Sequence, residues 1–239
     1  MTSPVAARRI VDLSHPITDG LVTYPGLDAP KITTFTSRDE SAARLGTGVS
    51  FHIGRIDMVA NTGTYLDTPH HYHVGGYDTA GLPLERVVDV TAVVIDATRI
   101  AAVGPDLLAD AGELAGHAVL FHTGWSRHWG TDAYFSGHPY LTRALVAVLI
   151  EAGPAIVGID SLNIDDATDP TRPAHHGLLG AGIPIVEHLT NLAELPPHGA
   201  RFTAVPAPIA GMATLPVRAV AVTGQRSPVL PGTESPGRG

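Results

Sequence analysis

Short apolar segments rich in β-branched residues recur along most of this chain, and they restrict the folds that it can adopt. Each segment has the length of a single β-strand and is bounded by residues that are typical of turns, such as Gly, Pro, Asp and Ser. The predicted strands are residues 9–13, 49–59, 87–96, 117–122, 155–159, 202–207 and 217–223.

Helical patterns are fewer than strand patterns. The clearest covers residues 140–152, where apolar residues recur at the spacing of one helix face, Thr142 is a candidate N-cap, and a Gly-Pro pair ends the helix. Shorter helices are predicted at residues 105–111 and 174–180. This mixture of strands and helices indicates an α/β or α+β fold.

The chain of 239 residues is long enough for one domain with a large core. Hydrophobic residues make up 44% of it and charged residues 16%, which is typical of a globular protein. We find no internal repeat and no dividing linker, so we predict one domain over residues 1–223. Residues 224–239 are rich in Gly, Pro and Ser, and we predict that they form a flexible tail.

Charge and composition exclude several kinds of function. The net charge of −8 leaves no basic stripe for nucleic acid or for an anionic membrane, so a small-molecule substrate is expected. The absence of cysteine excludes disulfides, thiolate metal sites and a cysteine nucleophile, so that any metal must be bound by His, Asp or Glu. The N-terminal segment lacks the apolar stretch of a signal peptide, and we therefore expect a cytoplasmic protein.

The densest group of histidines lies at residues 61–73, directly after a predicted strand. One glycine and one proline within this segment favour a turn on which polar side chains can converge. A metal site or an acid–base site would fit this clustering, whereas a solvated loop with turn-capping histidines is the alternative. The candidate side chains are Asp67, His70, His71 and His73.

A second polar group lies more than a hundred residues further along the chain. His175 and His176 open a predicted helix, and Glu187 ends the apolar, strand-like segment 182–187. A carboxylate at the end of a buried strand needs a partner, because burial without a counter-charge would raise its pKa sharply. Glu187 is therefore a candidate ligand, although an exposed position at the start of a helix would also explain it.

Five separated segments, taken in order, resemble the cyclase family that includes kynurenine formamidase and isatin hydrolase. The resemblance covers roughly residues 9–223 and implies a single-domain α/β fold with a mixed β-sheet core and flanking helices. It also implies hydrolysis of an amide, with one or two divalent metals activating water. The segments are residues 13–26, 63–69, 122–125, 157–165 and 175–189.

The ligand motif of the family reads His-x-Gly-Thr-His-x-Asp-x-Pro-x-His, followed much later by a His and a Glu. Four of its six positions match this chain, and two histidines are replaced by an asparagine and a tyrosine. An amide oxygen is a weak ligand, and tyrosine ionises only near pH 10, so these replacements disfavour the first metal site. The aligned residues are Asn61, Tyr65, Asp67, His71, His175 and Glu187.

From this resemblance we predict an arylformamidase-like hydrolase that cleaves an amide-like C–N bond of a small aromatic or cyclic substrate. A single divalent metal, zinc or manganese, would be bound by Asp67, His175 and Glu187, while His71 acts as the acid–base group. The resemblance further implies that Asn61, Tyr24 and Trp125 contact the substrate. It also suggests a homodimer or a homotetramer.

Two other functions compete with this prediction. A metal-independent biosynthetic cyclase or dehydratase could use Tyr65, Asp67, His71 and Glu187 as catalytic acids, bases and hydrogen-bond donors, with no metal cofactor. In that case Asp67 and Glu187 would repel each other, and one of them should carry a proton near neutral pH. The third possibility is a protein that has lost catalysis and binds a small molecule in the inherited pocket.

Overall fold

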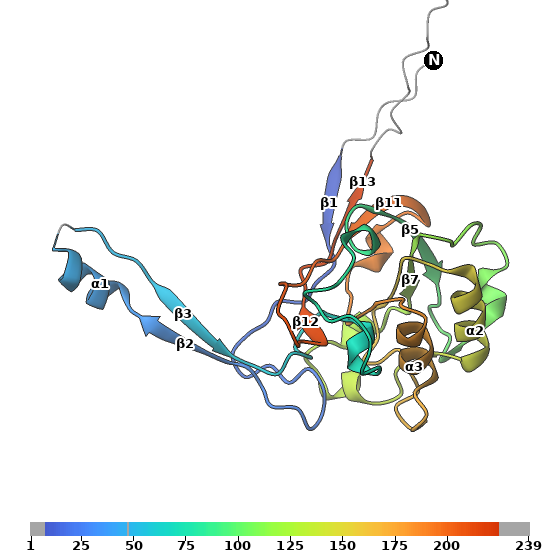
Figure 1. The fold of residues 1–239 in the computed structure, drawn as a ribbon, viewed down its shortest axis with the longest axis horizontal. Coiled ribbons are helices and arrows are strands. Elements are labelled where there is room, and N and C mark those ends of the chain that lie inside the picture. The colour runs from blue at the N-terminus through green and yellow to red at the C-terminus, as the bar shows by residue number, and fades with distance from the viewer. Residues whose placement is uncertain (1–7, 47, 225–239) are drawn as a thin grey trace, which may run out of the picture.

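Most strands of the protein join one large mixed sheet (Figure 1), in a computed structural model that describes residues 8–46 and 48–224. Within these residues the sheet has nine strands. In spatial order they are β1 (Arg9–Asp12), β13 (Val220–Thr223), β11 (His198–Thr203), β5 (Val90–Asp96), β7 (Ala118–His122), β9 (Ile156–Ile159), β10 (Ile185–Glu187), β4 (Tyr65–Asp67) and β12 (Thr214–Pro216).

The centre of the sheet is parallel and its two flanks are antiparallel. Strands β5, β7, β9 and β10 pair in parallel, whereas β11 and β4 join them in antiparallel orientation. Parallel strands covered on both faces need apolar side chains in both directions. This explains why β7 has the continuous apolar run AVLF and why every residue of β9 is buried.

Alternating side chains of the central strands supply two hydrophobic cores. In β5, Val93 and Ile95 belong to one core, and Val90 and Ala92 belong to the other. Helices α2 (Arg143–Ala152) and α3 (Pro173–Gly180) cover the first core and lie together beside the sheet (Figure 1). The predicted mixed sheet with flanking helices is therefore confirmed.

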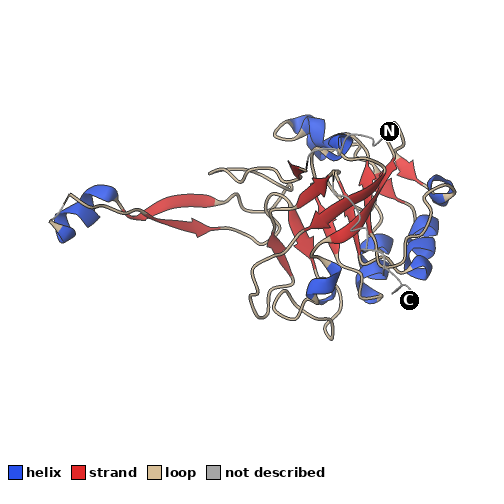
Figure 2. Cartoon of the chain, turned by 90° about the horizontal axis from the view of Figure 1, so that it is seen from above, coloured by secondary structure: helices blue, strands red, loops and turns tan. Residues whose placement is uncertain are grey.

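Three elements form an arm that projects away from the sheet (Figure 2). Strands β2 (Lys31–Thr36) and β3 (Ile53–Asp57) pair as an antiparallel ribbon, and α1 (Arg38–Leu45) lies between them in the chain. A short parallel pair, β6 (Ala102–Val103) and β8 (Tyr140–Leu141), completes the strands of the described residues.

Each of the seven predicted strands overlaps an observed strand, but some boundaries and helices need correction. The strand predicted at residues 49–59 is shortened to β3, because residues 49–52, which connect α1 to β3 within the arm, do not pair with β2. The helix predicted from residue 140 begins only after Thr142, whose Oγ1 accepts a hydrogen bond from the Leu145 amide as an N-cap. The helix predicted at residues 105–111 is a 3₁₀ turn, Pro105–Leu108.

One prediction, the flexible tail at residues 224–239, stays untested. All of the predicted tail except Gly224 lies outside the described residues. In the described part of the chain, no helix combines the length and the apolar character that crossing a membrane requires.

Candidate metal and acid–base site

Pairing of β4 with β10 brings together two segments that are more than a hundred residues apart in the chain. In this antiparallel register Tyr65 lies opposite Glu187, and Asp67 lies opposite Ile185. Side chains alternate along a strand, so Tyr65 and Asp67 point to one face while Leu66 enters the core on the other. The strand pairing thus places a phenol and two carboxylates on the same side of the sheet.

The loop before β4 is fixed by its backbone conformation. Gly63 has a φ of 69°, and a Cβ at this position would lie 2.7 Å from Cγ1 of Ile17. The Gly63 amide donates to Thr23 Oγ1, and the Thr64 hydroxyl donates to the His188 carbonyl at 2.6 Å. This anchoring holds Asn61 beside the start of β4.

A single 3₁₀ turn, Pro69–His71, follows β4 and carries His71 back over the strand. Proline at its first position fixes φ at a value that suits the turn. His71 Nε2 consequently lies 3.9 Å from Asp67 Oδ1, and the imidazole keeps 30% of its surface exposed. His71 is therefore both close to the carboxylate and open to a ligand.

His175 lies in the first turn of α3 and is held by a buried carboxylate. Asp165 Oδ1 accepts from the Ala174 amide at 2.6 Å, and Asp165 Oδ2 accepts from the His175 amide at 3.0 Å. The same Oδ2 lies 2.7 Å from His175 Nδ1. This contact orients the imidazole and directs Nε2 toward β4.

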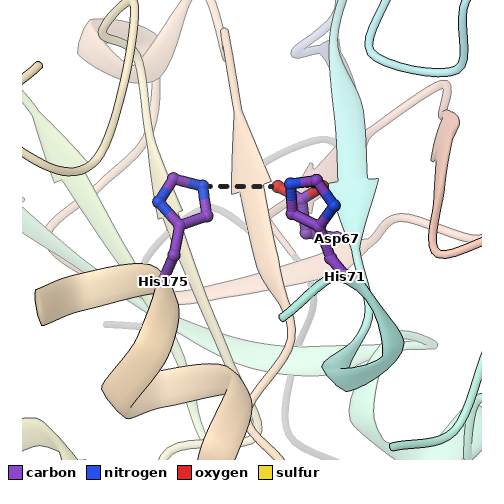
Figure 3. Close-up of side chains that lie close together, drawn as sticks. All are labelled: Asp67, His71 and His175. Atoms are coloured by element: carbon purple, nitrogen blue, oxygen red, sulfur yellow. Dashed lines mark ion pairs between the residues drawn. The ribbon is translucent and has the colours of Figure 1, made fainter. Parts of the chain in front are cut away.

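Asp67, His71 and His175 point toward one another across the gap between β4 and α3 (Figure 3). One nitrogen or oxygen atom from each lies within 4.8 Å of the others. His175 Nε2 is 3.8 Å from Asp67 Oδ2 and 3.7 Å from Glu187 Oε1. The predicted ligands are Asp67, His175 and Glu187. The observed cluster contains His71 instead of Glu187, and Glu187 lies close to His175.

Burial and neighbouring charges give the two carboxylates, Asp67 and Glu187, very different pKa values. Asp67 is fully buried, and desolvation, opposed by the nearby histidines, raises its pKa to about 6. Burial would also raise the pKa of Glu187, but the charge of His175 outweighs it and lowers this pKa to about 2. For His175, burial is likewise outweighed by Glu187 and Asp165, which raise its pKa to about 10.

Tyr65 occupies a position next to Glu187 rather than next to Asp67. Its hydroxyl donates to Glu187 Oε2 at 2.7 Å, while the Ile164 amide donates to Glu187 Oε1 at 2.6 Å. Burial and the two neighbouring carboxylates raise the pKa of Tyr65 well above its ordinary value. The phenol therefore stays protonated and acts as a hydrogen-bond donor.

The donor set fits one divalent cation. Asp67 Oδ1 accepts a hydrogen bond from Thr214, but Asp67 Oδ2 is buried and has no hydrogen-bond partner. The unpartnered oxygen of Asp67 faces Nε2 of His175, and a cation bound between them would satisfy the oxygen and take the place of the proton that the raised pKa keeps on the ring. Nitrogen and oxygen ligands of this kind suit zinc or manganese, and the Asp165 contact is typical of the support given to a ligating histidine.

A cavity of about 250 Å³ opens beside this cluster. It brings together most of the predicted site residues, including Tyr24 and Asn61. The side chains lining it are Tyr24, Leu27, Asn61, Tyr65, His71, Tyr72, Asn163, Arg172, His175 and Glu187. A larger hollow of about 650 Å³ lies beside Ser14 and His15, but it lacks the carboxylate and imidazole cluster.

Trp125 does not line this cavity. Its indole N–H donates to the Tyr134 carbonyl at 3.0 Å, and Arg127 lies over its ring. It follows a tight turn that the Asp160 carboxylate fixes by accepting from the Thr123 and Gly124 amides. The predicted contact of Trp125 with substrate thus has no support from the geometry.

Sequence reasoning missed three residues that shape the site. Tyr72 stacks on the His175 ring with the centroids 5.1 Å apart, and Arg172 lines the cavity from the loop before α3. Tyr72 lies within the histidine-rich segment 61–73, and this position could have indicated a place at the site. Asp165 is the third, because its Oδ2 contacts Nδ1 of the His175 ring.

Comparisons with known proteins find relatives similar to this chain in sequence and in fold. The cyclase family profile matches residues 11–166. A kynurenine formamidase of Salinibacter ruber is 31% identical over 218 residues, covering 88% of this chain and 96% of that protein. Among solved structures, isatin hydrolase A from Labrenzia aggregata is 25% identical with a TM-score of 0.78, covering 91% of this chain and 94% of that one. A potential metal-dependent hydrolase with cyclase activity gives 28% identity and a TM-score of 0.75, covering 93% and 100%.

Proposed function

The chain belongs to the cyclase family, and from that premise we propose that it hydrolyses an amide-like C–N bond in a small aromatic or cyclic substrate. A hydrolase is the class that its relatives support, since they include kynurenine formamidase and isatin hydrolase. The names of these relatives suggest formamides of aromatic amines and isatin as the first substrates to test. The volume of the cavity, about 250 Å³, suits a molecule of that size.

One observation carries the proposal: Asp67 Oδ2 is buried without a partner and faces His175 Nε2 at 3.8 Å. We propose that Asp67 and His175 hold one divalent metal, zinc or manganese, with Glu187 as the third ligand. His71 is the alternative third ligand, because it belongs to the cluster of closest atoms. A metal bound there would act as a Lewis acid on the carbonyl and lower the pKa of water.

The chain's own residues would handle the proton and the substrate. Amide hydrolysis adds water across the C–N bond, so the departing nitrogen must receive a proton. His71 is the partly exposed group of the cluster, and in our proposal its Nε2 gives up that proton. Asp67 keeps the imidazole in place, while Tyr24 and Asn61 contact the substrate from the other wall of the cavity.

The test uses the purified full-length chain, stripped of metal and then titrated with Zn²⁺ or Mn²⁺. We expect one bound metal per chain, a higher melting temperature and hydrolysis of an arylformamide or of isatin. Asp67→Asn should lose bound metal and activity together. His71→Asn should keep the metal and lose about 10²–10⁴-fold in kcat, as is usual for a missing acid–base group.

His73→Asn is the matched control, because His73 lies two positions further along the same segment and its ring contacts the His176 carbonyl outside the cavity. This variant should behave like the unmodified protein. Loss of the metal in His71→Asn would make His71 a ligand instead. If added metal changes neither the melting temperature nor the activity, the metal-dependent mechanism is wrong.

A second candidate function is favoured by the contact between Tyr65 and Glu187. The 2.7 Å hydrogen bond places a protonated phenol against a carboxylate, and His71 lines the same cavity. Such a set could enolise, dehydrate or cyclise a substrate without metal, if the phenol turns its one O–H from Glu187 to a developing oxyanion. Tyr65→Phe separates the two functions. It should abolish metal-independent turnover and leave metal-dependent hydrolysis within about tenfold.

A further inference from the structure

Arg172 is the one arginine or lysine among the described side chains that line the cavity of about 250 Å³. It lies directly before α3, in the same segment as His175, and is half-buried. Its backbone has a left-handed φ of 44°, which glycine adopts freely and arginine adopts only under strain. Glycine would relieve this strain, so the arginine side chain is the feature of this position that needs an explanation.

The aspartates of the same loop do not neutralise Arg172. Asp165 accepts hydrogen bonds from the first turn of α3, and Asp166 and Asp169 each accept from the backbone amide and the hydroxyl of the threonine two positions further along. None of these carboxylates forms an ion pair with Arg172 in the described part of the chain. The guanidinium charge is therefore available to a ligand in the cavity.

Two backbone carbonyl groups hold the guanidinium of Arg172 in place. Its Nη1 donates to the Asp166 carbonyl at 3.2 Å, and its Nη2 donates to the Ala167 carbonyl at 3.2 Å. A guanidinium has five N–H donors in a rigid plane, so most of them remain after these two bonds. Such a fixed, planar set of donors matches the two oxygens of a carboxylate.

Two neutral donors lie on the same side of the cavity as Arg172. Tyr72 stacks on the His175 ring, and its hydroxyl makes no hydrogen bond with the described residues. Asn163 Oδ1 accepts from the Asp165 amide at 2.9 Å, which leaves the NH₂ group of Asn163 to donate elsewhere. Both side chains line the cavity together with Arg172. This side of the cavity thus offers hydrogen-bond donors from three separate segments.

We infer that Arg172, with Tyr72 and Asn163, binds a carboxylate of the substrate. The inference rests on the proposed hydrolysis and narrows its substrates to small aromatic or cyclic amides that carry a carboxylate. A half-buried guanidinium binds such a group strongly, because little water screens the charges. A phosphate is disfavoured, since it would add a second negative charge to a cavity that already contains the Glu187 carboxylate.

Turnover of matched acids and amides tests the inference. Each isomer of formamidobenzoate is compared with the formamidobenzamide of the same substitution, which is neutral and of similar size. For at least one isomer, kcat/KM of the unmodified chain should favour the acid by about tenfold or more. Arg172→Gln should remove most of this preference, while Arg172→Lys should keep part of it, since lysine retains the charge without the planar fork. No preference in the unmodified chain, or the full preference in Arg172→Gln, would overturn the inference.

Calorimetric titration with the aminobenzoate isomers tests the same contact without turnover. The dissociation constant of the tightest isomer should rise at least about tenfold in Arg172→Gln. If no formamide is hydrolysed but this loss of affinity is measured, the proposed hydrolysis is wrong and the carboxylate site remains. If formamides are hydrolysed and neither preference nor affinity responds to Arg172→Gln, the carboxylate site alone is wrong.

Arg143→Gln is the matched control. Arg143 donates to Thr171 of the same loop from α2, and its side chain is 68% exposed and does not line the cavity. The variant removes the same charge from the same loop, so the preference and the affinity should both stay as in the unmodified chain. An equal loss in Arg143→Gln would contradict a direct contact of Arg172 with the carboxylate. Melting curves of all three variants should each show one cooperative transition.

Discussion

Asp165 shows how a residue outside the cavity can decide the chemistry inside it. Its carboxylate accepts two backbone hydrogen bonds at the start of α3 and contacts Nδ1 of His175, all within 3.0 Å. Arg172, at the N-cap position, offers no side-chain cap and has a left-handed φ of 44°. Asp165 therefore replaces the missing cap and sets the direction of the His175 ring.

Asp165→Asn should weaken metal binding while leaving the chain folded. Asparagine keeps one acceptor oxygen and puts an NH₂ group in place of the other. Either the His175 ring then loses its acceptor, or the start of α3 loses a backbone hydrogen bond. We expect a 10–100-fold lower metal affinity and a loss of about 1–3 kcal/mol in the free energy of unfolding. Competition with a chelator gives the affinity and urea unfolding gives the stability. An unchanged affinity would show that the contact does not orient a ligand.

Asn61 and Tyr65 are the two positions at which the chain departs from the family's ligand motif. If their replacement removed one metal site, then the double variant Asn61→His, Tyr65→His should raise the metal content from about one to about two per chain. Elemental analysis of the dialysed protein measures this ratio. Asn61→Gln, Tyr65→Phe is the control and should not gain a metal; a gain in both variants would speak against imidazole ligation.

At the scale of the elements, β9 depends on a glycine in the middle of the sheet. A Cβ on Gly158 would lie 2.8 Å from methyl carbons of both Leu120 and Leu189, which are fully buried. Glycine at this position lets β7, β9 and the segment after β10 pack closely, and it keeps Glu187 in register with Tyr65.

Gly158→Ala should consequently cost about 1–3 kcal/mol in the free energy of unfolding, because buried leucines cannot move away freely. The melting temperature should fall by about 2–4 °C for each kcal/mol. Gly104→Ala is the control, since a Cβ there meets nothing within 4 Å. A melting temperature equal to that of the control would show that the leucines adjust without strain.

At the scale of the whole molecule, the loop after β1 packs against the body through His15. Its ring stacks on Trp129 with centroids 4.1 Å apart, and its Nε2 is buried without a partner. Burial lowers the pKa of His15 to about 4, compared with 6.5 in an unfolded chain. As the pH falls, His15 therefore becomes protonated in the unfolded chain at a higher pH than in the folded chain. This protonation stabilises the unfolded state and so favours unfolding.

The contribution of His15 to stability should be fully present above about pH 6.5 and lost as the pH falls toward 4. Since part of the ring is exposed, we expect a loss of about 2 kcal/mol rather than the full value of the shift. His15→Phe keeps the stacking and removes the titration, so it should lose less stability than the unmodified protein between about pH 7 and pH 4.5. Equal losses in urea unfolding would refute this role.

Much of the sheet was predictable because its information is local. Alternating and continuous apolar runs marked β5, β7 and β9, and Thr142 marked the start of α2. The arm was only partly predicted, because β2 and α1 are largely exposed and bury only Thr36 and Ser41. An element that folds against no core leaves no periodic apolar pattern in the sequence.

The sequence by itself determined the fold class and the types of side chain at the site, since composition, strand patterns and the ligand motif are properties of short segments. Only the tertiary structure decided which atoms meet. The register of β4 against β10 pairs Tyr65 with Glu187, and α3 brings His175 to the free oxygen of Asp67. Such contacts depend on long-range packing of both cores, which no local pattern encodes.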